Sequence, residues 1–287
     1  MNPNPQPEPT APPQVLEETQ PPFQPIAQAE AEAEAKMRKM SRRSFLWAAL
    51  AVGSGYGGLR WLDSRRMDEG IPWPLRRALQ VNEEVGRDFF SPARLAPTFT
   101  SAQVRPLRLN GDIGLDEDFD ASTWKLSVEG LADEKSPTKE ITLAQIKALP
   151  RVEMISELRC IEGWATIVQW AGARMSDFMQ KFPPATQSGA KLDLSKPQDL
   201  PAFVGMTTPD GAYYVGLEME AALHPQTLLC YEMNGAPLKP EHGAPLRLAI
   251  PVKYGVKNIK RIGTIAYTNH RPADYWAELG YDYYAGH

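Results

Sequence analysis

The 287-residue sequence has too few cysteines, too little positive charge and no glycine-rich phosphate motif for several classes of protein. Two cysteines, Cys160 and Cys230, allow at most one bridge and exclude a disulfide scaffold. A net charge of −4 argues against a nucleic-acid binder, which usually carries a basic face. Because no G-x-G-x-x-G motif follows a predicted strand, a nucleotide-phosphate loop is not expected. The length still suffices for a full hydrophobic core, in one large domain or two small ones.

The first 35 residues have the composition of a disordered tail. They hold six acidic residues and no basic one, so the rest of the chain carries about +2. Proline, glutamine, glutamate and alanine dominate, and Phe23 is the only aromatic residue. Such a segment cannot bury enough apolar surface to offset the entropy cost of ordering. We therefore predict disorder over residues 1–35, with transient helix in the Ala- and Glu-rich tract 27–35.

A basic and then apolar segment follows, over residues 36–64. Three basic residues lead into S-R-R-S-F-L at 41–46, and a moderately apolar run extends to Leu62. The paired arginines resemble a twin-arginine export signal. The alternative is the basic flank of a membrane helix. Both interpretations place the residues after about 65 outside the cytoplasm.

The apolar run of roughly 18 residues is just long enough to span a bilayer. No clear A-x-A cleavage site follows it, so an uncleaved N-terminal anchor is one expected outcome. Arg60 lies inside the run and would have to extend to the interface. The sequence thus predicts a protein on the periplasmic side of a bacterial inner membrane, exported in folded form by the twin-arginine route.

We interpret residues 65–103 as a linker with a lead-in helix at 75–85, and residues 104–287 as one folded domain. In that domain many short strands alternate with few short helices, which indicates an α+β fold and not a regular parallel sheet. The aromatic tail after residue 269 is expected to pack as a surface wrap. Strands are predicted at 124–129, 151–158, 202–206, 212–215, 227–233, 246–251 and 259–268. Helices are predicted at 143–149, with Thr142 as the N-terminal cap, and at 174–182 and 217–223.

One cysteine stands out in this pattern. Cys160 ends a predicted buried strand directly after Arg159, whose positive charge favours the thiolate. Thiolate is the form that binds soft metals or attacks electrophiles. The alternative is a small core residue, because free cysteine is among the most buried residue types. Cys230, in an apolar strand, is expected to be such a core thiol.

A basic segment at 231–260 suggests a binding site for an anion. Its positive charges alternate with prolines, glycines and apolar residues, which is more typical of a shaped pocket rim than of a solvated face. Cationic side chains and free N–H groups on turns are what a phosphate-bearing ligand requires. The residues concerned are His242, Arg247, Lys253, Lys257 and Lys260.

The two stretches together resemble the sulfite oxidase family of molybdenum-pterin enzymes, including its bacterial exported branch with the methionine-sulfoxide reductase catalytic subunit. The resemblance covers about residues 104–268. It rests on RCIEGWATIVQWAGARMSDFM at 159–179 and on the ordered motifs NG-x-PL, HG-x-P-x-R and KYG-x-K-x-IK within 234–260. It implies a sulfite-oxidase-type molybdopterin-binding domain of short mixed strands and short helices. It also implies oxidoreductase activity and a molybdenum-molybdopterin cofactor.

The resemblance further implies a set of site residues. Cys160 is the implied thiolate ligand of molybdenum, and Tyr214 falls where sulfite oxidases place an active-site tyrosine. Tyr213 precedes Tyr214 in a strand, so alternation alone turns one of the two toward the core. Arg108 and Arg159 are the cations available to a small anionic substrate. Contacts to the pterin and its phosphate fall on Asn110, Asp112, Thr207, His242, Arg247, Asn258, Ile259 and Lys260.

The expected reaction is two-electron oxygen-atom transfer at molybdenum. An exported chain without a haem motif favours reduction of an S-oxide or similar small oxide. Its electrons would come from a separate b-type haem membrane protein or a cytochrome. The chain stops before the dimerisation domain of animal sulfite oxidases, which predicts a monomer. The alternatives are sulfite oxidation, a non-catalytic envelope module on the same fold, and a thiol hydrolase with Cys160 as nucleophile and a histidine as base.

Overall fold

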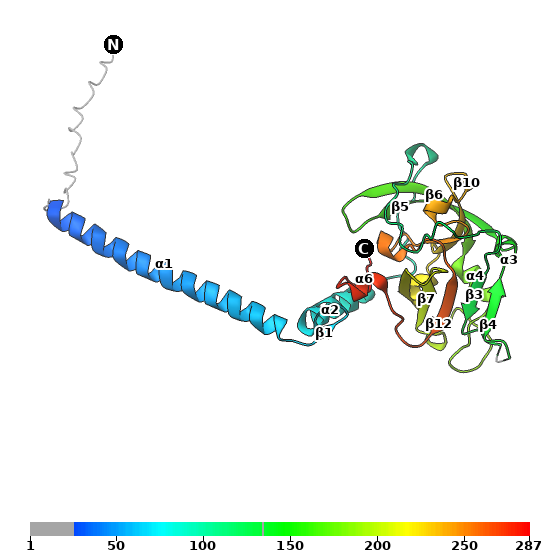
Figure 1. The fold of residues 1–287 in the computed structure, drawn as a ribbon, viewed down its shortest axis with the longest axis horizontal. Coiled ribbons are helices and arrows are strands. Elements are labelled where there is room, and N and C mark those ends of the chain that lie inside the picture. The colour runs from blue at the N-terminus through cyan, green and yellow to red at the C-terminus, as the bar shows by residue number, and fades with distance from the viewer. Residues whose placement is uncertain (1–25, 134) are drawn as a thin grey trace, which may run out of the picture. The chain divides into compact units, whose positions relative to one another are not determined.

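The computed structural model describes residues 26–133 and 135–287, and the chain divides into two compact units, Met1–Ser64 and Arg65–His287. The described part of the first unit is dominated by one helix, α1 (Ile26–Asp63) (Figure 1). It begins in the tract expected to be only transiently helical, because alanine and glutamate are strong helix formers. Residues 1–25 of the predicted disordered tail lie outside the described residues. Within the described ranges, no helix combines the length and the apolar character needed to cross a membrane.

The second unit opens with a short hairpin and a helix. The hairpin strands are β1 (Met67–Asp68) and β2 (Ile71–Pro72), and α2 (Trp73–Phe89) follows at once. Helix α2 extends the predicted lead-in helix at both ends, with a proline in its first turn, where no N–H partner is lost. Its buried residues are charged, Arg76 and Glu83. Residues 65–103 therefore belong to the same compact unit as the sheets.

The first of two five-stranded sheets is antiparallel and has the strand order β10-β9-β6-β5, with β11 also paired to β9. The long hairpin of β5 and β6 carries the segment around Cys160. The strands are β5 (Arg151–Arg159), β6 (Ala165–Arg174), β9 (Leu228–Met233), β10 (Ala236–Pro237) and β11 (Arg247–Ala249).

The second sheet has the order β4-β3-β12-β7-β8 (Figure 1). Strands β3 and β12 pair in parallel, and the other neighbours are antiparallel. The strands are β3 (Leu126–Glu129), β4 (Thr138–Ile141), β7 (Phe203–Thr207), β8 (Tyr214–Glu218) and β12 (Thr264–Thr268).

Short helices connect the strands. Thr142 caps α3 by accepting the Gln145 N–H, which confirms the cap expected from the sequence. The helices are α3 (Leu143–Lys147), α4 (Met175–Lys181), α5 (Met219–Ala222) and α6 (Tyr275–Glu278), with 3-10 turns η1 (Ser101–Gln103), η2 (Pro197–Asp199), η3 (Pro240–His242) and η4 (Gly255–Lys257).

Two hydrophobic cores cover opposite faces of the first sheet. Side chains alternate along a strand, so Leu229 of β9 joins the larger core and Cys230 the smaller one. The larger core also takes buried residues from the second sheet and from helices α3 to α5. The smaller core surrounds Trp170 and ends at Leu158, two residues before Cys160. The α+β fold and the core position of Cys230 are confirmed.

Several element predictions differ from the structure, and three of the differences have a clear physical reason. The sequence did not predict β6, because both faces of this strand are largely buried and its apolar residues do not alternate with polar ones. Residues 217–218, predicted as the start of a helix, end β8, and only 219–222 are helical. The predicted strand 259–268 is extended only from Thr264. The residues before it form turns whose backbone groups bond other segments.

Candidate active site

A cavity of about 370 Å³ forms in the second unit where distant stretches of the chain meet. The stretch 107–113, the β5–β6 turn and the segment 247–260 supply most of its walls, and the C-terminal tail completes them. The lining residues are Leu107, Arg108, Asn110, Gly111, Ile113, Leu158, Cys160, Ile161, Glu162, Trp164, Tyr213, Arg247, Gly255, Val256, Asn258, Lys260, Trp276 and Tyr281.

Cys160 lies in the tight turn between β5 and β6. Its N–H donates to the Trp164 carbonyl at 2.9 Å, and the Gly163 N–H donates to the Cys160 carbonyl at 3.1 Å. Gly163 has a φ of 87°, which glycine adopts without steric cost. The cysteine is 9% exposed, and its Sγ lies 3.8 Å from Asn110 Nδ2. The turn therefore holds the thiol at the cavity wall, with an amide group beside it.

The cation expected beside the thiol is turned away from it. Side chains alternate along β5, so Arg159 points to the opposite side from Leu158 and Cys160. Its Nε donates to Glu157 Oε2 at 2.5 Å, and both side chains line a separate depression. The expected pairing of Arg159 with the thiolate is corrected accordingly. Of the two arginines considered for an anionic substrate, Arg108 lines the cavity, with its guanidinium carbon 5.7 Å from the Trp164 ring centre.

Arg247, in β11, supplies a buried positive charge. It is 2% exposed, and its Nη atoms donate to the carbonyls of His242 at 3.0 Å and Asn258 at 3.3 Å. Burial lowers the pKa of Arg247 to about 10. Its Nε and the Nδ1 of His242 are buried and have no hydrogen-bond partner among the described residues. Buried polar atoms of this kind usually mark a missing partner such as a ligand or an ordered water.

Lys260 supplies a second cation and connects the basic segment to the cysteine. Its Nζ donates to the carbonyls of Asn110 at 2.9 Å and Gly111 at 2.8 Å. Burial, followed by the charge of Arg247, lowers the pKa of Lys260 to about 8. Asn110 therefore contacts both Lys260, through its carbonyl, and the Cys160 sulfur, through its amide.

The cavity brings together about half of the residues that the resemblance implied. The loop at 107–113 and the segment 247–260 approach the cysteine only in the folded chain. The predicted site residues that line the cavity are Asn110, Cys160, Arg247, Asn258 and Lys260.

Three predicted residues of the basic segment act mainly within the protein. His242 supports Arg247 through its backbone carbonyl. The Asn258 side chain is engaged by backbone, because its Oδ1 accepts the Ile250 N–H at 2.8 Å. Ile259 is 1% exposed in the larger core, and its carbonyl accepts the Leu248 N–H. Any ligand contact from Ile259 must therefore come from its backbone.

Asp112 and Thr207 do not line the cavity. Asp112 is exposed in a turn of the 107–113 stretch, yet its charge opposes the lowering of the Lys260 pKa. Thr207 ends β7, and its carbonyl accepts the Gly263 N–H at 2.8 Å. The structure thus places neither residue at the cavity wall.

Tyr213, and not the predicted Tyr214, lines the cavity. The Tyr213 hydroxyl donates to the Val256 carbonyl at 2.6 Å, and burial raises the pKa of Tyr213. Tyr214 begins β8 and points the other way, where its hydroxyl donates to the Glu278 carboxylate. That hydrogen bond raises the pKa of Tyr214 to about 12. Because side chains alternate along the strand, Tyr213 occupies the cavity position predicted for Tyr214.

Lys253 and Lys257, predicted to be part of a pocket rim, instead hold the C-terminal tail. Both are 1% exposed, and neither lines the cavity. Lys253 Nζ donates to Glu218 Oε2 at 2.9 Å and to the Tyr284 carbonyl at 2.6 Å. Lys257 Nζ donates to Asp274 Oδ2 at 2.5 Å. Their charges are satisfied inside the protein and are not available to a ligand.

Among the further residues that line the cavity, four carry an acidic or aromatic side chain. Glu162 and Trp164 follow the cysteine, and Trp164 Nε1 donates to Glu162 Oε2 at 3.0 Å. Trp276 and Tyr281 come from the tail expected to wrap the surface, and their ring centres are 5.0 Å apart. Nearness to Cys160 in the sequence would have found the first pair. The second pair depends on the path of the tail.

Comparison with known families matches residues 113–276 to the oxidoreductase molybdopterin binding domain. Among curated proteins, the chain is 33% identical over 251 residues to YedZ1 of Azospira oryzae, named as a candidate protein-methionine-sulfoxide reductase subunit, covering 86% of this chain and 88% of that protein. It is 33% identical over 181 residues to the protein-methionine-sulfoxide reductase catalytic subunit MsrP of Campylobacter jejuni, covering 60% of this chain and 59% of that protein. The corresponding figures for MsrP of Ralstonia nicotianae are 31% identity over 262 residues, covering 82% and 71%.

Among solved structures, the sulfane dehydrogenase SoxCD from Paracoccus pantotrophus matches with a TM-score of 0.43 and 15% identity, covering 54% of this chain and 40% of that chain. The family match spans more than half of the chain and includes Cys160 and the basic segment. The relative from Azospira oryzae aligns over most of both proteins. The chain therefore belongs to the oxidoreductase molybdopterin-binding domain family, and it is a molybdopterin-dependent oxidoreductase of the sulfite oxidase family that uses a molybdenum-molybdopterin cofactor.

Proposed function

We propose that this enzyme reduces an S-oxide by oxygen-atom transfer at a molybdenum ion ligated by Cys160, with electrons from a separate haem protein. The observation that carries the proposal is the convergence of the Cys160 thiol with Arg247 and Lys260 on one cavity, from two separate parts of the chain. No histidine is found among the described residues that line the cavity, which disfavours a thiol hydrolase with Cys160 as nucleophile.

The residues present fit the cofactor. A cysteine thiolate is a soft ligand of the kind that molybdenum accepts beside the pterin sulfurs. Arg247 and Lys260 offset phosphate charge, and the Arg247 Nε still has a hydrogen bond to give. When bound, the molybdenum-pterin group supplies two-electron oxygen-atom chemistry.

The chain itself binds the substrate and handles protons. Reducing a sulfoxide to a thioether and water consumes two electrons and two protons. Glu162 places a carboxyl group at the cavity wall, where the Trp164 N–H orients it, and we assign proton transfer to this group. Trp164, Trp276 and Ile113 form apolar walls that contact the carbon substituents of a sulfoxide and exclude water. The electrons must come from outside these residues, so we infer a b-type haem membrane protein or a cytochrome as the donor.

Two further observations support the proposed setting. The names of the relatives describe subunits of protein-methionine-sulfoxide reductase, which supports an S-oxide as the substrate class. The sequence S-R-R-S-F-L at 41–46 supports export by the twin-arginine route to the periplasmic side of the inner membrane.

Sulfite oxidation is the second candidate, because an arginine is present at the cavity. Arg108 is exposed at the cavity wall and stands over the Trp164 ring. A sulfite anion gains from such a cation, whereas a neutral sulfoxide needs no charge partner.

The purified, metal-loaded enzyme is expected to reduce methionine sulfoxide with a reduced viologen dye as electron donor. In Arg108→Gln the KM for methionine sulfoxide within an uncharged peptide should change less than about twofold, since such a substrate loses no ion pair. Steady-state kinetics measure both quantities, with sulfite and ferricyanide as the opposing assay. Faster sulfite oxidation, with a KM for sulfite raised about tenfold in Arg108→Gln, would replace the reductase assignment by the oxidase.

Cofactor loading should weaken as pH rises through the pKa of Lys260. In the cofactor-free chain this pKa is about 8, and a bound phosphate raises it because it favours the charged amine. Binding therefore takes up a proton above pH 8, and the loading constant should fall about tenfold between pH 7 and pH 9. Molybdenum per chain after incubation with released cofactor measures the effect.

Lys260→Met should load poorly at both pH values and show no such difference. The matched control is Lys125→Met, which removes an exposed lysine paired with Glu140. It should keep the wild-type profile. An equal pH dependence in Lys260→Met and wild type would assign the effect to another group.

A further inference from the structure

The aromatic wall of the cavity is carried by a short turn of the C-terminal tail. Helix α6 is only four residues long, and the chain reverses after it so that the Tyr281 N–H donates to the Trp276 carbonyl at 3.0 Å. Gly280 makes the reversal with a φ of 95°. These bonds close the turn on itself. Its placement at the cavity therefore depends on contacts with other segments.

The start of the turn is held by the sheet domain. Asp274 caps α6 by accepting the Ala277 N–H, and its other oxygen accepts from Lys257 and from the Gly216 N–H. Asp274 is 4% exposed, so these hydrogen bonds are shielded from water. The end of the turn, at Tyr281, needs a separate attachment.

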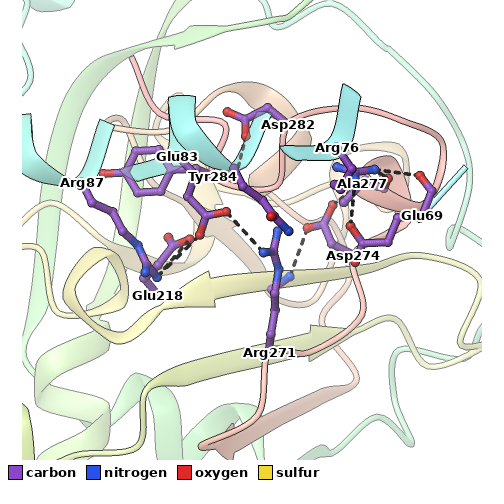
Figure 2. Close-up of polar contacts among 12 residues, drawn as sticks. Glu69, Arg76, Glu83, Arg87, Glu218, Arg271, Asp274, Ala277, Asp282 and Tyr284 are labelled. Atoms are coloured by element: carbon purple, nitrogen blue, oxygen red, sulfur yellow. Dashed lines mark hydrogen bonds and ion pairs between the residues drawn. The ribbon is translucent and has the colours of Figure 1, made fainter. Parts of the chain in front are cut away.

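Arg76 of α2 provides the second attachment (Figure 2). Its Nη1 donates to the Tyr281 carbonyl at 2.9 Å, and its Nη2 donates to the carbonyls of Ala277 at 2.6 Å and Glu69 at 2.7 Å. The Glu69 carboxylate lies 3.3 Å from Nε. Arg76 is 1% exposed, and a buried guanidinium is tolerated only when its donors are satisfied in this way.

The hairpin before α2 fits against the same turn. A methyl group added to Gly280 would lie 2.6 Å from Ile71 Cγ2, and one added to Gly70 would lie 2.2 Å from the Glu278 carbonyl oxygen. Two glycines therefore allow the backbones of the hairpin and the turn to come close together. The lead-in segment and the tail pack without a gap, and Arg76 lies at their junction.

We propose that Arg76 is a positioning residue of the active site. Its planar guanidinium joins the carbonyls at the two ends of the 277–281 turn and so fixes Trp276 and Tyr281 as the wall against which the substrate lies. A lysine cannot replace it, because one ammonium does not present two donors in a fixed plane. Helix α2 therefore supports the active site through Arg76, although it contributes no residue to the cavity wall. The proposal rests on the proposed function only for the identity of the substrate.

Arg76→Lys in the full-length enzyme tests this, with Arg77→Lys as the matched control. Arg77 is the next residue of α2, and its exposed side chain bonds Gln80. Hydrogen–deuterium exchange of the 275–284 peptide should quicken about tenfold in Arg76→Lys, while exchange in β9 stays unchanged. Molybdenum per chain should also stay unchanged. The KM for the substrate that the wild type turns over should rise about tenfold, with kcat within about twofold.

Unchanged exchange in the 275–284 peptide of Arg76→Lys would overturn the proposal, and so would faster exchange with an unchanged KM. A failure of the proposed function is distinguishable from this result, because the wild-type enzyme itself would then not turn over sulfoxides. Should Arg76→Lys not fold, Glu69→Gln takes its place. It removes only the carboxylate that orients Nε and should give a smaller rise in the same exchange rates. No rise in Glu69→Gln would equally overturn the proposal.

Discussion

Replacing Cys160 with serine is expected to lower the molybdenum content from about one per chain to near zero and to abolish oxygen-atom transfer. The hydroxyl of serine is a hard, weakly acidic group that does not replace a thiolate as a soft metal ligand. Removing a group that only supports a metal ligand lowers metal affinity or activity by roughly 10- to 100-fold. The loss of activity in Cys160→Ser should be larger, because the ligand itself is removed. Elemental analysis and turnover of methionine sulfoxide, on protein from a host that makes the cofactor, measure both effects.

Cys230→Ala is the matched control for this experiment. Cys230 is fully buried in β9 and does not line the cavity, and burial raises the pKa of Cys230 to about 12, so it stays a neutral thiol. Its replacement should cost about 1 kcal/mol of stability through lost packing and leave the metal content unchanged. Retention of molybdenum in Cys160→Ser, or its absence from the wild type, would contradict the assignment of Cys160 as the ligand.

Lys257→Met is expected to lower the free energy of unfolding by about 3–5 kcal/mol. The ion pair of Lys257 with Asp274 is almost fully buried, with side-chain exposures of 1% and 3%. Removing the lysine leaves a buried carboxylate without its charge partner, and it also weakens the cap of α6. Urea denaturation followed by fluorescence measures the change.

Two further variants separate this effect from a general loss of charge. Lys125→Met removes the lysine of an exposed pair with Glu140, with exposures of 52% and 65%, and should cost less than about 1 kcal/mol. The double variant Lys257→Met, Asp274→Asn removes both charges and should recover part of the lost stability. A double variant as unstable as the sum of its parts would show that the charge pair is not the cause.

The buried pairs of Lys253 and Lys257 explain why the basic segment predicts a larger pocket rim than the structure has. A lysine between glycines and prolines has the same local sequence whether it faces a ligand or a carboxylate from elsewhere in the chain. Glu218 lies 35 residues from Lys253 in the sequence, and Asp274 lies 17 residues from Lys257. Arg247 and Lys260, from the same segment, do line the cavity.

The sequence by itself determined the features that depend on composition and on neighbouring residues. These include the family, the α+β fold, the strand that ends before Cys160, the cap of α3 and the core thiol Cys230. Each follows from a local pattern, because side-chain period, capping chemistry and an ordered motif act within a few residues of one another.

Only the tertiary structure decided which groups face the cavity. It placed Tyr213 there instead of Tyr214, turned Arg159 toward Glu157, and brought Trp276 to the wall from the tail. It also attached that tail to α2 through Arg76. These outcomes depend on strand phase and on contacts between segments far apart in the chain. The local sequence does not show which residues will come into contact over such distances. The free energy that favours these contacts arises only when the chain has folded and the contacting segments meet.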